Sequence, residues 1–77
     1  MSNTMVDVTL HVDENTSHEQ REDLRDRLLS QNGVMAASAH DKTPHLIVVE
    51  YDPAQVSSGQ LVELAKSQGM HAELIGL

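Results

Sequence analysis

The fold is decided by the stretch at residues 5–12, which reads MVDVTLHV. Apolar and polar residues alternate strictly along it. On one side of an extended chain the stretch places Val6, Val8, Leu10 and Val12. A period of two is typical of a strand with one buried and one solvated face. The stretch therefore predicts a half-buried β-strand near the beginning of the chain.

Capping signals predict two helices. Ser17 and Gln20 have the spacing of a capping box, in which each side chain satisfies a backbone N–H of the other residue. Thr16 and Glu19 offer the same spacing one residue earlier. Ser57 marks the start of a second helix in the same way, and leucines follow both starts at helical spacing.

Three further strands complete the pattern. Residues 34–40 read VMAASAH, residues 45–51 read HLIVVEY, and residues 71–77 read HAELIGL. The resulting order, β-α-β-β-α-β, fills a single domain over residues 1–77. It predicts an α+β, ferredoxin-like sandwich with two helices on one face of a four-stranded antiparallel sheet. Right-handed crossovers place the first and third strands in the centre of that sheet.

The predicted core is aliphatic and small, because the chain has a single aromatic residue, Tyr51. Its members lie on the inward side of each predicted element. They are Val6, Val8, Leu10, Val12, Leu24, Leu28, Ile47, Val49, Tyr51, Leu61, Leu64, Met70 and Leu74. A single-core domain of this size has only a few kcal/mol of net stability.

Composition and charge exclude several classes of function. Twelve acidic and five basic residues give a formal net charge of −7. Nucleic acids and anionic membranes attract basic surfaces, so we expect neither as a partner. The absence of cysteine excludes disulfides and thiolate sites. The first residues lack a signal-peptide pattern and no apolar run reaches about 18 residues, so we expect a cytoplasmic domain without membrane insertion.

A series of short motifs runs through most of the chain. They are Leu24-x-x-x-Leu28, Gly33-Val34, Val49-Glu50-Tyr51-Asp52-Pro53, Val56-Ser57, Leu61 and Gly69-Met70. In this order and spacing they resemble the heavy-metal-associated domain family, which includes small copper chaperones and the N-terminal modules of metal-transporting ATPases. The resemblance implies the same fold. It also implies a soft metal ion at a Met-x-Cys-x-x-Cys loop between the first strand and the first helix.

This chain lacks that metal motif. Counted back from Gly33, the two cysteines of the family correspond to Ser17 and Gln20, and the methionine corresponds to Asn15. Two thiolates bind Cu(I) well because ligand and ion are both soft. A hydroxyl and a carboxamide cannot replace them, so Cu(I) binding is not carried over and no cofactor is certain.

Histidines and carboxylates offer a different kind of metal site, because the topology places all five histidines near one end of the domain. The candidate ligands are His11, His18, His40, His71, Asp13 and Glu14, with Glu73 as a further carboxylate. Strand parity directs His11, His40 and His71 to the open sheet face, and His45 to the helix side. Such ligands suit Zn(II), Cu(II) and Ni(II). The alternative is five separate solvated histidines, because no pair has metal-binding spacing along the chain.

The open face of the sheet is the other candidate site. By parity it carries Leu46, Val48 and Ile75 among polar residues. An apolar strip on a solvent face indicates an interaction surface, although β-propensity alone also places such residues on strands. We therefore interpret the domain as a module that acts by protein contact, with a basic protein or a second copy in a homodimer as the partner.

Two other functions are weighed against protein contact. One is a carrier or sensor for a borderline divalent ion, bound by histidine and carboxylate, and the other is a small-ligand sensor on a fold that hosts many functions. An enzyme is not expected, because no serine has a nucleophile-elbow context and no deep pocket is indicated.

Overall fold

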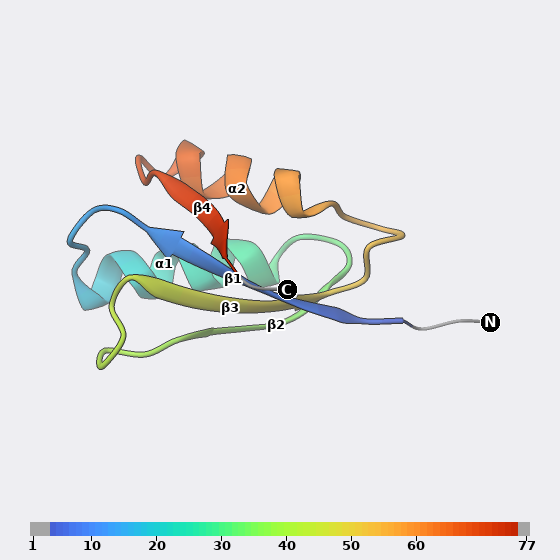
Figure 1. The fold of residues 1–77 in the computed structure, drawn as a ribbon, viewed down its shortest axis with the longest axis horizontal. Coiled ribbons are helices and arrows are strands. Elements are labelled where there is room, and N and C mark those ends of the chain that lie inside the picture. The colour runs from blue at the N-terminus through green and yellow to red at the C-terminus, as the bar shows by residue number, and fades with distance from the viewer. Residues whose placement is uncertain (1–3, 76–77) are drawn as a thin grey trace.

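The computed structural model describes residues 4–75, and within them two helices and four strands follow the predicted order (Figure 1). The elements are β1 (Val6–Val12), α1 (His18–Leu29), β2 (Val34–Ala39), β3 (Leu46–Tyr51), α2 (Ser58–Ser67) and β4 (Ala72–Ile75). The strand order is β2-β3-β1-β4, and every neighbouring pair is antiparallel. The prediction of an α+β, ferredoxin-like sheet with β1 and β3 at its centre is confirmed.

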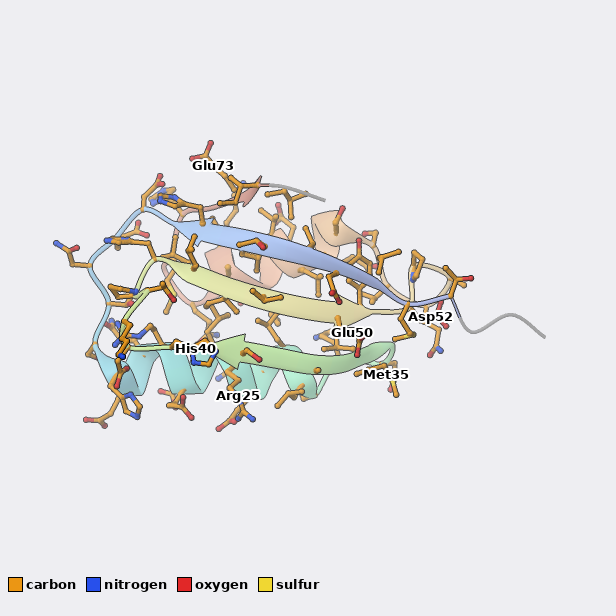
Figure 2. All side chains as sticks on the ribbon, turned by 60° about the horizontal axis from the view of Figure 1, so that its bottom comes forward. Arg25, Met35, His40, Glu50, Asp52 and Glu73 are labelled. Atoms are coloured by element: carbon orange, nitrogen blue, oxygen red, sulfur yellow. The ribbon has the colours of Figure 1, made fainter. Side chains whose placement is uncertain are left out.

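Both helices cover one face of the sheet, and Figure 2 looks onto the other, open face. The core lies between the helices and the sheet. Its largest fully buried side chains are Leu10, Leu24, Leu28, Ile47, Leu61, Val8, Val12 and Val49. All of them were expected in the core. Neither helix of the described residues is long and apolar enough to cross a membrane.

The predicted core is wrong at Leu74, whose residue surface is 40% exposed. β4 is an edge strand that pairs only with β1, and it is four residues long, so its end is poorly covered. The predicted strand was longer: β4 begins at Ala72, and residues 76 and 77 lie outside the described part.

Of the other predicted core residues, Val6 and Leu64 are only partly buried against the core. Buried residues that the predicted core list did not include are Val34, Ala37, Val56, Ala65 and Ala72.

Both helices begin with a capping box, as the serine–glutamine spacing predicted. The Gln20 N–H donates to Ser17 Oγ at 3.1 Å, and the Ser17 N–H donates to Gln20 Oε1 at 2.8 Å. Ser57 and Gln60 repeat this arrangement with the same two distances. Each box satisfies two of the backbone donors that a helix start leaves free. Of the two alternatives for α1, the structure therefore has the box that begins at Ser17.

Asp7 on β1 lies directly opposite Glu50 on β3, so two carboxylates are cross-strand neighbours on the open face (Figure 2 labels Glu50). Like charges in this position destabilise a sheet. We expect Glu50→Lys to raise the free energy of unfolding by a few tenths to about 1 kcal/mol, because an attractive pair replaces a repulsive one. Urea denaturation at low and high salt measures this. Glu50→Gln, which removes only the repulsion, should gain less, and an unchanged or lower stability of both variants would contradict the prediction.

Candidate functional site

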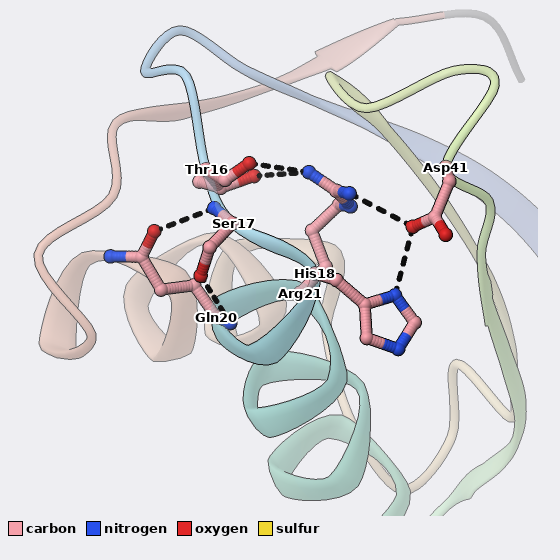
Figure 3. A network of polar contacts seen from close by, with 6 residues as sticks. All are labelled: Thr16, Ser17, His18, Gln20, Arg21 and Asp41. Carbon is pink, nitrogen blue, oxygen red and sulfur yellow. Dashed lines mark hydrogen bonds and ion pairs between the residues drawn. The ribbon is translucent and has the colours of Figure 1, made fainter.

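The loop before α1 does not fit the metal ion that the family resemblance implies. Ser17 and Gln20 stand at the two positions where the family motif has cysteines, and both side chains are engaged in the capping box (Figure 3). Neither residue offers the soft donor that Cu(I) prefers. The same three-residue spacing that would bring two thiolates together here closes the start of a helix.

A buried arginine links this loop to the turn between β2 and β3. The Arg21 side chain is 8% exposed. Its Nη1 donates to the carbonyl oxygen and to Oγ1 of Thr16, and its Nη2 donates to Asp41 Oδ1 at 2.9 Å (Figure 3). His18 Nδ1 lies 2.9 Å from the same carboxylate oxygen. One cation under the loop and one imidazole beside it therefore share a single carboxylate.

Sequence reasoning missed both Arg21 and Asp41. Arg21 precedes Leu24 by three positions and Leu28 by seven, so helical periodicity puts all three on the buried face of α1. That spacing was the available signal, although an arginine is rarely buried. Nothing in the sequence points to Asp41, because it pairs with residues 20 and 23 positions away.

Two histidine–carboxylate pairs shift the pKa values of their members. A hydrogen bond to Asp41 raises the pKa of His18 above its ordinary value, and one to Glu14 raises the pKa of His71. The pKa of Asp41 is lowered by His18 first and by Arg21 second. The pKa of Glu14 is lowered mainly by the His71 side chain. Each hydrogen bond favours the charged form of both partners.

The raised histidine pKa values predict a pH dependence with a definite sign. Their stabilising effect is fully present below the ordinary histidine pKa of 6.5 and is lost as the pH rises through the raised values. The carboxylate contribution is present above the ordinary value and is lost as the pH falls through the lowered one.

In an NMR titration of the imidazole resonances, we expect Asp41→Asn to lower the pKa of His18 and Glu14→Gln to lower that of His71. Each substitution should leave the other histidine unchanged, so the two variants control for each other. An unchanged His18 pKa in Asp41→Asn would show that the pair does not form in solution.

Three ligand-type side chains converge at the end of β1. They belong to His11, Asp13 and Glu73, and one potential ligand atom from each lies within 4.8 Å of the others. His11 is the cross-strand partner of Glu73, and the Asp13 N–H donates to the His71 carbonyl at 2.9 Å, so the β1–β4 pairing holds the group. His11 Nδ1 lies 3.4 Å from Asp13 Oδ1. Imidazole and carboxylate ligands of this kind can bind a borderline divalent cation.

His45 lies beside this cluster. Its ring stacks on the His11 ring with centroids 5.7 Å apart and an interplanar angle of 17°. Its Nδ1 lies 2.7 Å from the carbonyl oxygen of Val12. Strand parity directed His45 to the helix side, but His45 lies just before β3 begins, and its ring stacks on His11 of β1, which parity does not predict.

The other predicted ligands are distributed around the same end. His71 joins Glu14, which accepts hydrogen bonds from the His71 N–H at 2.8 Å and from Nδ1 of its ring. His18 joins Asp41. His40 follows β2, at the opposite edge of the sheet from Glu73 on β4 (Figure 2). The six predicted ligands thus do not form one group, and His11 and Asp13 are the two that meet a third ligand-type side chain.

The open face carries a short apolar row. Val48 on β3 and Ile75 on β4 are 41% and 43% exposed, and both are cross-strand partners of Thr9 on β1. Leu46 lies on β3 two residues before Val48, is half-buried and lies opposite His11. The apolar row and the His11 cluster therefore occupy adjacent rows of the same face.

No protein-family model and no curated protein matches the sequence. Several solved structures do match the fold. The N-terminal domain of a potential copper-translocating P-type ATPase from Bacillus subtilis, in its Cu(I)-loaded state, has a TM-score of 0.86 at 22% identity, over 95% of this chain and 90% of that one. Oxidized MerP from Ralstonia metallidurans has a TM-score of 0.85 at 20% identity, over 95% and 100%.

A copper-binding domain from the P-type ATPase HMA7 has a TM-score of 0.83 at 23% identity, over 91% of this chain and 93% of that domain. At such low identities these likenesses show the fold. The structural neighbours are heavy-metal-associated domains, as the resemblance predicted, while this chain has no cysteine for their metal motif.

Proposed function

We propose that the domain binds a divalent metal ion of the borderline class, Zn(II), Cu(II) or Ni(II), through histidine and carboxylate ligands. The observation that carries this proposal is the convergence of His11, Asp13 and Glu73 at one end of the sheet. The solved domains with the same fold, two of which are described as copper-binding or Cu(I)-loaded, support metal handling as the role. Without thiolates, harder and borderline ions replace Cu(I).

The role that suits such a site is that of a carrier or sensor in the cytoplasm. His11 and Asp13 are partly exposed, so an ion on the sheet face has direct access to solvent. Three protein ligands leave a tetrahedral ion with one open position, through which it can be exchanged. Metal transfer or sensing needs such exchange and does not need a substrate pocket.

Titration of the isolated chain with each ion tests this function. We expect isothermal calorimetry to show saturable binding of about one equivalent of Zn(II), Cu(II) or Ni(II). Mg(II) should not bind, because a hard ion that keeps its waters gains little from imidazole. If none of the three transition ions binds at up to millimolar concentration, the proposed function is wrong.

Protein contact through the open face is a second candidate function. It is supported by the exposure of Val48 and Ile75 in one cross-strand row. Asp7 and Glu50 lie on the same face, and like charges would oppose each other if two copies stacked face to face. A partner with an apolar patch and basic surroundings therefore fits this surface better than a homodimer does.

A photo-crosslinking amino acid at position 48 tests this second candidate in cells. Position 35 is the matched control, because Met35 is exposed at the β2 edge, away from the apolar row (Figure 2). We expect crosslinks to another protein from position 48 and not from position 35. Crosslinks to a second copy of the chain would favour a homodimer, and equal crosslinking from both positions would contradict a specific surface.

A further inference from the structure

We infer that the metal ion binds at His11, Asp13 and Glu73 on the open sheet face, with His45 as a positioning residue, and not at the Ser17 and Gln20 positions where α1 begins. This assignment rests on the proposed function and names its site. It moves the metal from the helix start, where the family motif would hold it, to the pairing of β1 with β4.

The backbone already places the three ligands. His11 and Glu73 are cross-strand partners, and Asp13 continues β1 with its N–H bonded to the His71 carbonyl. Zinc–nitrogen and zinc–oxygen bonds of about 2.1 Å in a tetrahedron separate neighbouring ligand atoms by about 3.4 Å. His11 Nδ1 and Asp13 Oδ1 are 3.4 Å apart. Since all the ligand atoms lie within 4.8 Å of one another, the remaining separations need to shorten by at most about 1.4 Å, which the exposed Glu73 side chain can supply by rotation.

The charge of the cluster also fits a divalent ion. A neutral His11 with two carboxylates carries two negative charges, which one divalent cation balances. Within the described residues neither Asp13 nor Glu73 forms an ion pair with a lysine or arginine. An ion therefore displaces no cation when it binds there, and it relieves the repulsion between the two carboxylates.

The start of α1, at Ser17 and Gln20, is a poor place for the same ion. The Ser17 and Gln20 side chains are engaged in the capping box. The carboxylate that contacts the first turn of α1, Asp41, already accepts from Arg21 and lies in hydrogen-bond contact with His18. A cation at this carboxylate would compete with a buried guanidinium for the same oxygen and would be repelled by it.

His45 fixes the orientation of His11. A carbonyl oxygen only accepts hydrogen bonds, so the contact with the Val12 carbonyl requires a hydrogen on His45 Nδ1. The ring held in this way stacks on the His11 ring and limits its rotation. Groups that hold a ligand in place in this manner strengthen metal binding without touching the ion.

Zn(II) titration of the wild type and five single variants, followed by calorimetry and by NMR of the backbone amides, tests the site. The ligand variants are His11→Ala, Asp13→Asn and Glu73→Gln. His40→Ala is the matched control for loss of an exposed histidine, and His18→Ala probes the loop. We expect each ligand variant to weaken Zn(II) binding at least tenfold, and both control variants to change it less than twofold. The amide spectrum of each variant shows that it is folded.

The outcomes separate this inference from the proposed function. If the wild type binds Zn(II), His18→Ala abolishes this binding and His11→Ala retains it, the site assignment is wrong. The proposed function, metal binding, would still stand. Equal, small losses in all five variants would indicate scattered adventitious binding and would overturn the site as well. If wild type binds none of the transition ions, both fail.

The role of His45 is tested separately by His45→Ala and His45→Phe. We expect His45→Ala to weaken Zn(II) binding several-fold, and His45→Phe to retain most of it, because phenylalanine keeps a ring against His11. Electron paramagnetic resonance of the Cu(II)-loaded chain should show one directly bound nitrogen, from His11. Two bound nitrogens, or full affinity in His45→Ala, would overturn the positioning role.

Discussion

Replacing Leu10 with alanine is expected to leave the domain largely unfolded at room temperature. Leu10 is fully buried at the centre of β1, and truncating such a side chain costs about 2–5 kcal/mol through lost burial and the cavity that remains. Domains of this size rarely have more than about 3–5 kcal/mol of net stability. Far-UV circular dichroism with urea denaturation measures the loss.

Leu74→Ala is the matched control, because Leu74 is the cross-strand partner of Leu10 in the β1–β4 pairing. Both variants replace leucine with alanine, at two positions that lie directly opposite each other in the β1–β4 pairing. Leu74 is exposed at the edge, so we expect a loss of less than about 1 kcal/mol. A similar loss of stability in both variants would mean that β4 is covered in solution. Leu74 would then belong to the core, as the sequence predicted.

Gly33→Ala is expected to destabilise the domain by about 2–5 kcal/mol. Gly33 has a φ of +98°, where an L-residue costs about 1–2 kcal/mol. A Cβ there would also lie 2.7 Å from the Gln55 Cβ and 3.1 Å from Val56 Cγ1. Because Val56 is buried, the chain cannot easily give way, and such overpacking costs about a further 1–3 kcal/mol. Thermal or urea unfolding of the variant measures the effect.

Gly69→Ala separates the two causes. Gly69 has a φ of +79°, but a Cβ there would meet nothing within 4 Å. It should therefore show the backbone cost alone, about 1–2 kcal/mol. If Gly33→Ala is no worse than Gly69→Ala, the close approach of residues 55 and 56 to the turn after α1 is not present in solution.

The fold was predictable because it depends on patterns that recur locally. The alternation over residues 5–12 gave β1, and the serine–glutamine spacing gave both helix starts. The predictions that were wrong or missing concern residues whose burial depends on neighbours distant in the sequence. Leu74 has the parity of a core residue, but no rule of parity says how much of an edge strand the helices cover. Arg21 is buried because Asp41 and Thr16 reach it, and no local pattern contains that contact.

The candidate site was predictable only in part. Topology places histidines and carboxylates towards one end, and the β1–β4 register explains why His11 lies opposite Glu73. The sequence could not separate His11 and Asp13 from His18 and His40, because that depends on how side chains turn beyond the strand ends. The stacking of His45 on His11 depends on the same local geometry.

The capping box at Ser17 and Gln20 has a consequence for how the domain responds to its surroundings. In a domain whose helix begins beside a thiolate metal site, loss of the metal or oxidation of the sulfur changes the groups that surround the first turn of that helix. Here the helix start is closed by hydroxyl, carboxamide and backbone groups, none of which is oxidised or removed by a chelator. The start of α1 thus depends neither on a bound metal nor on the oxidation state of a thiol.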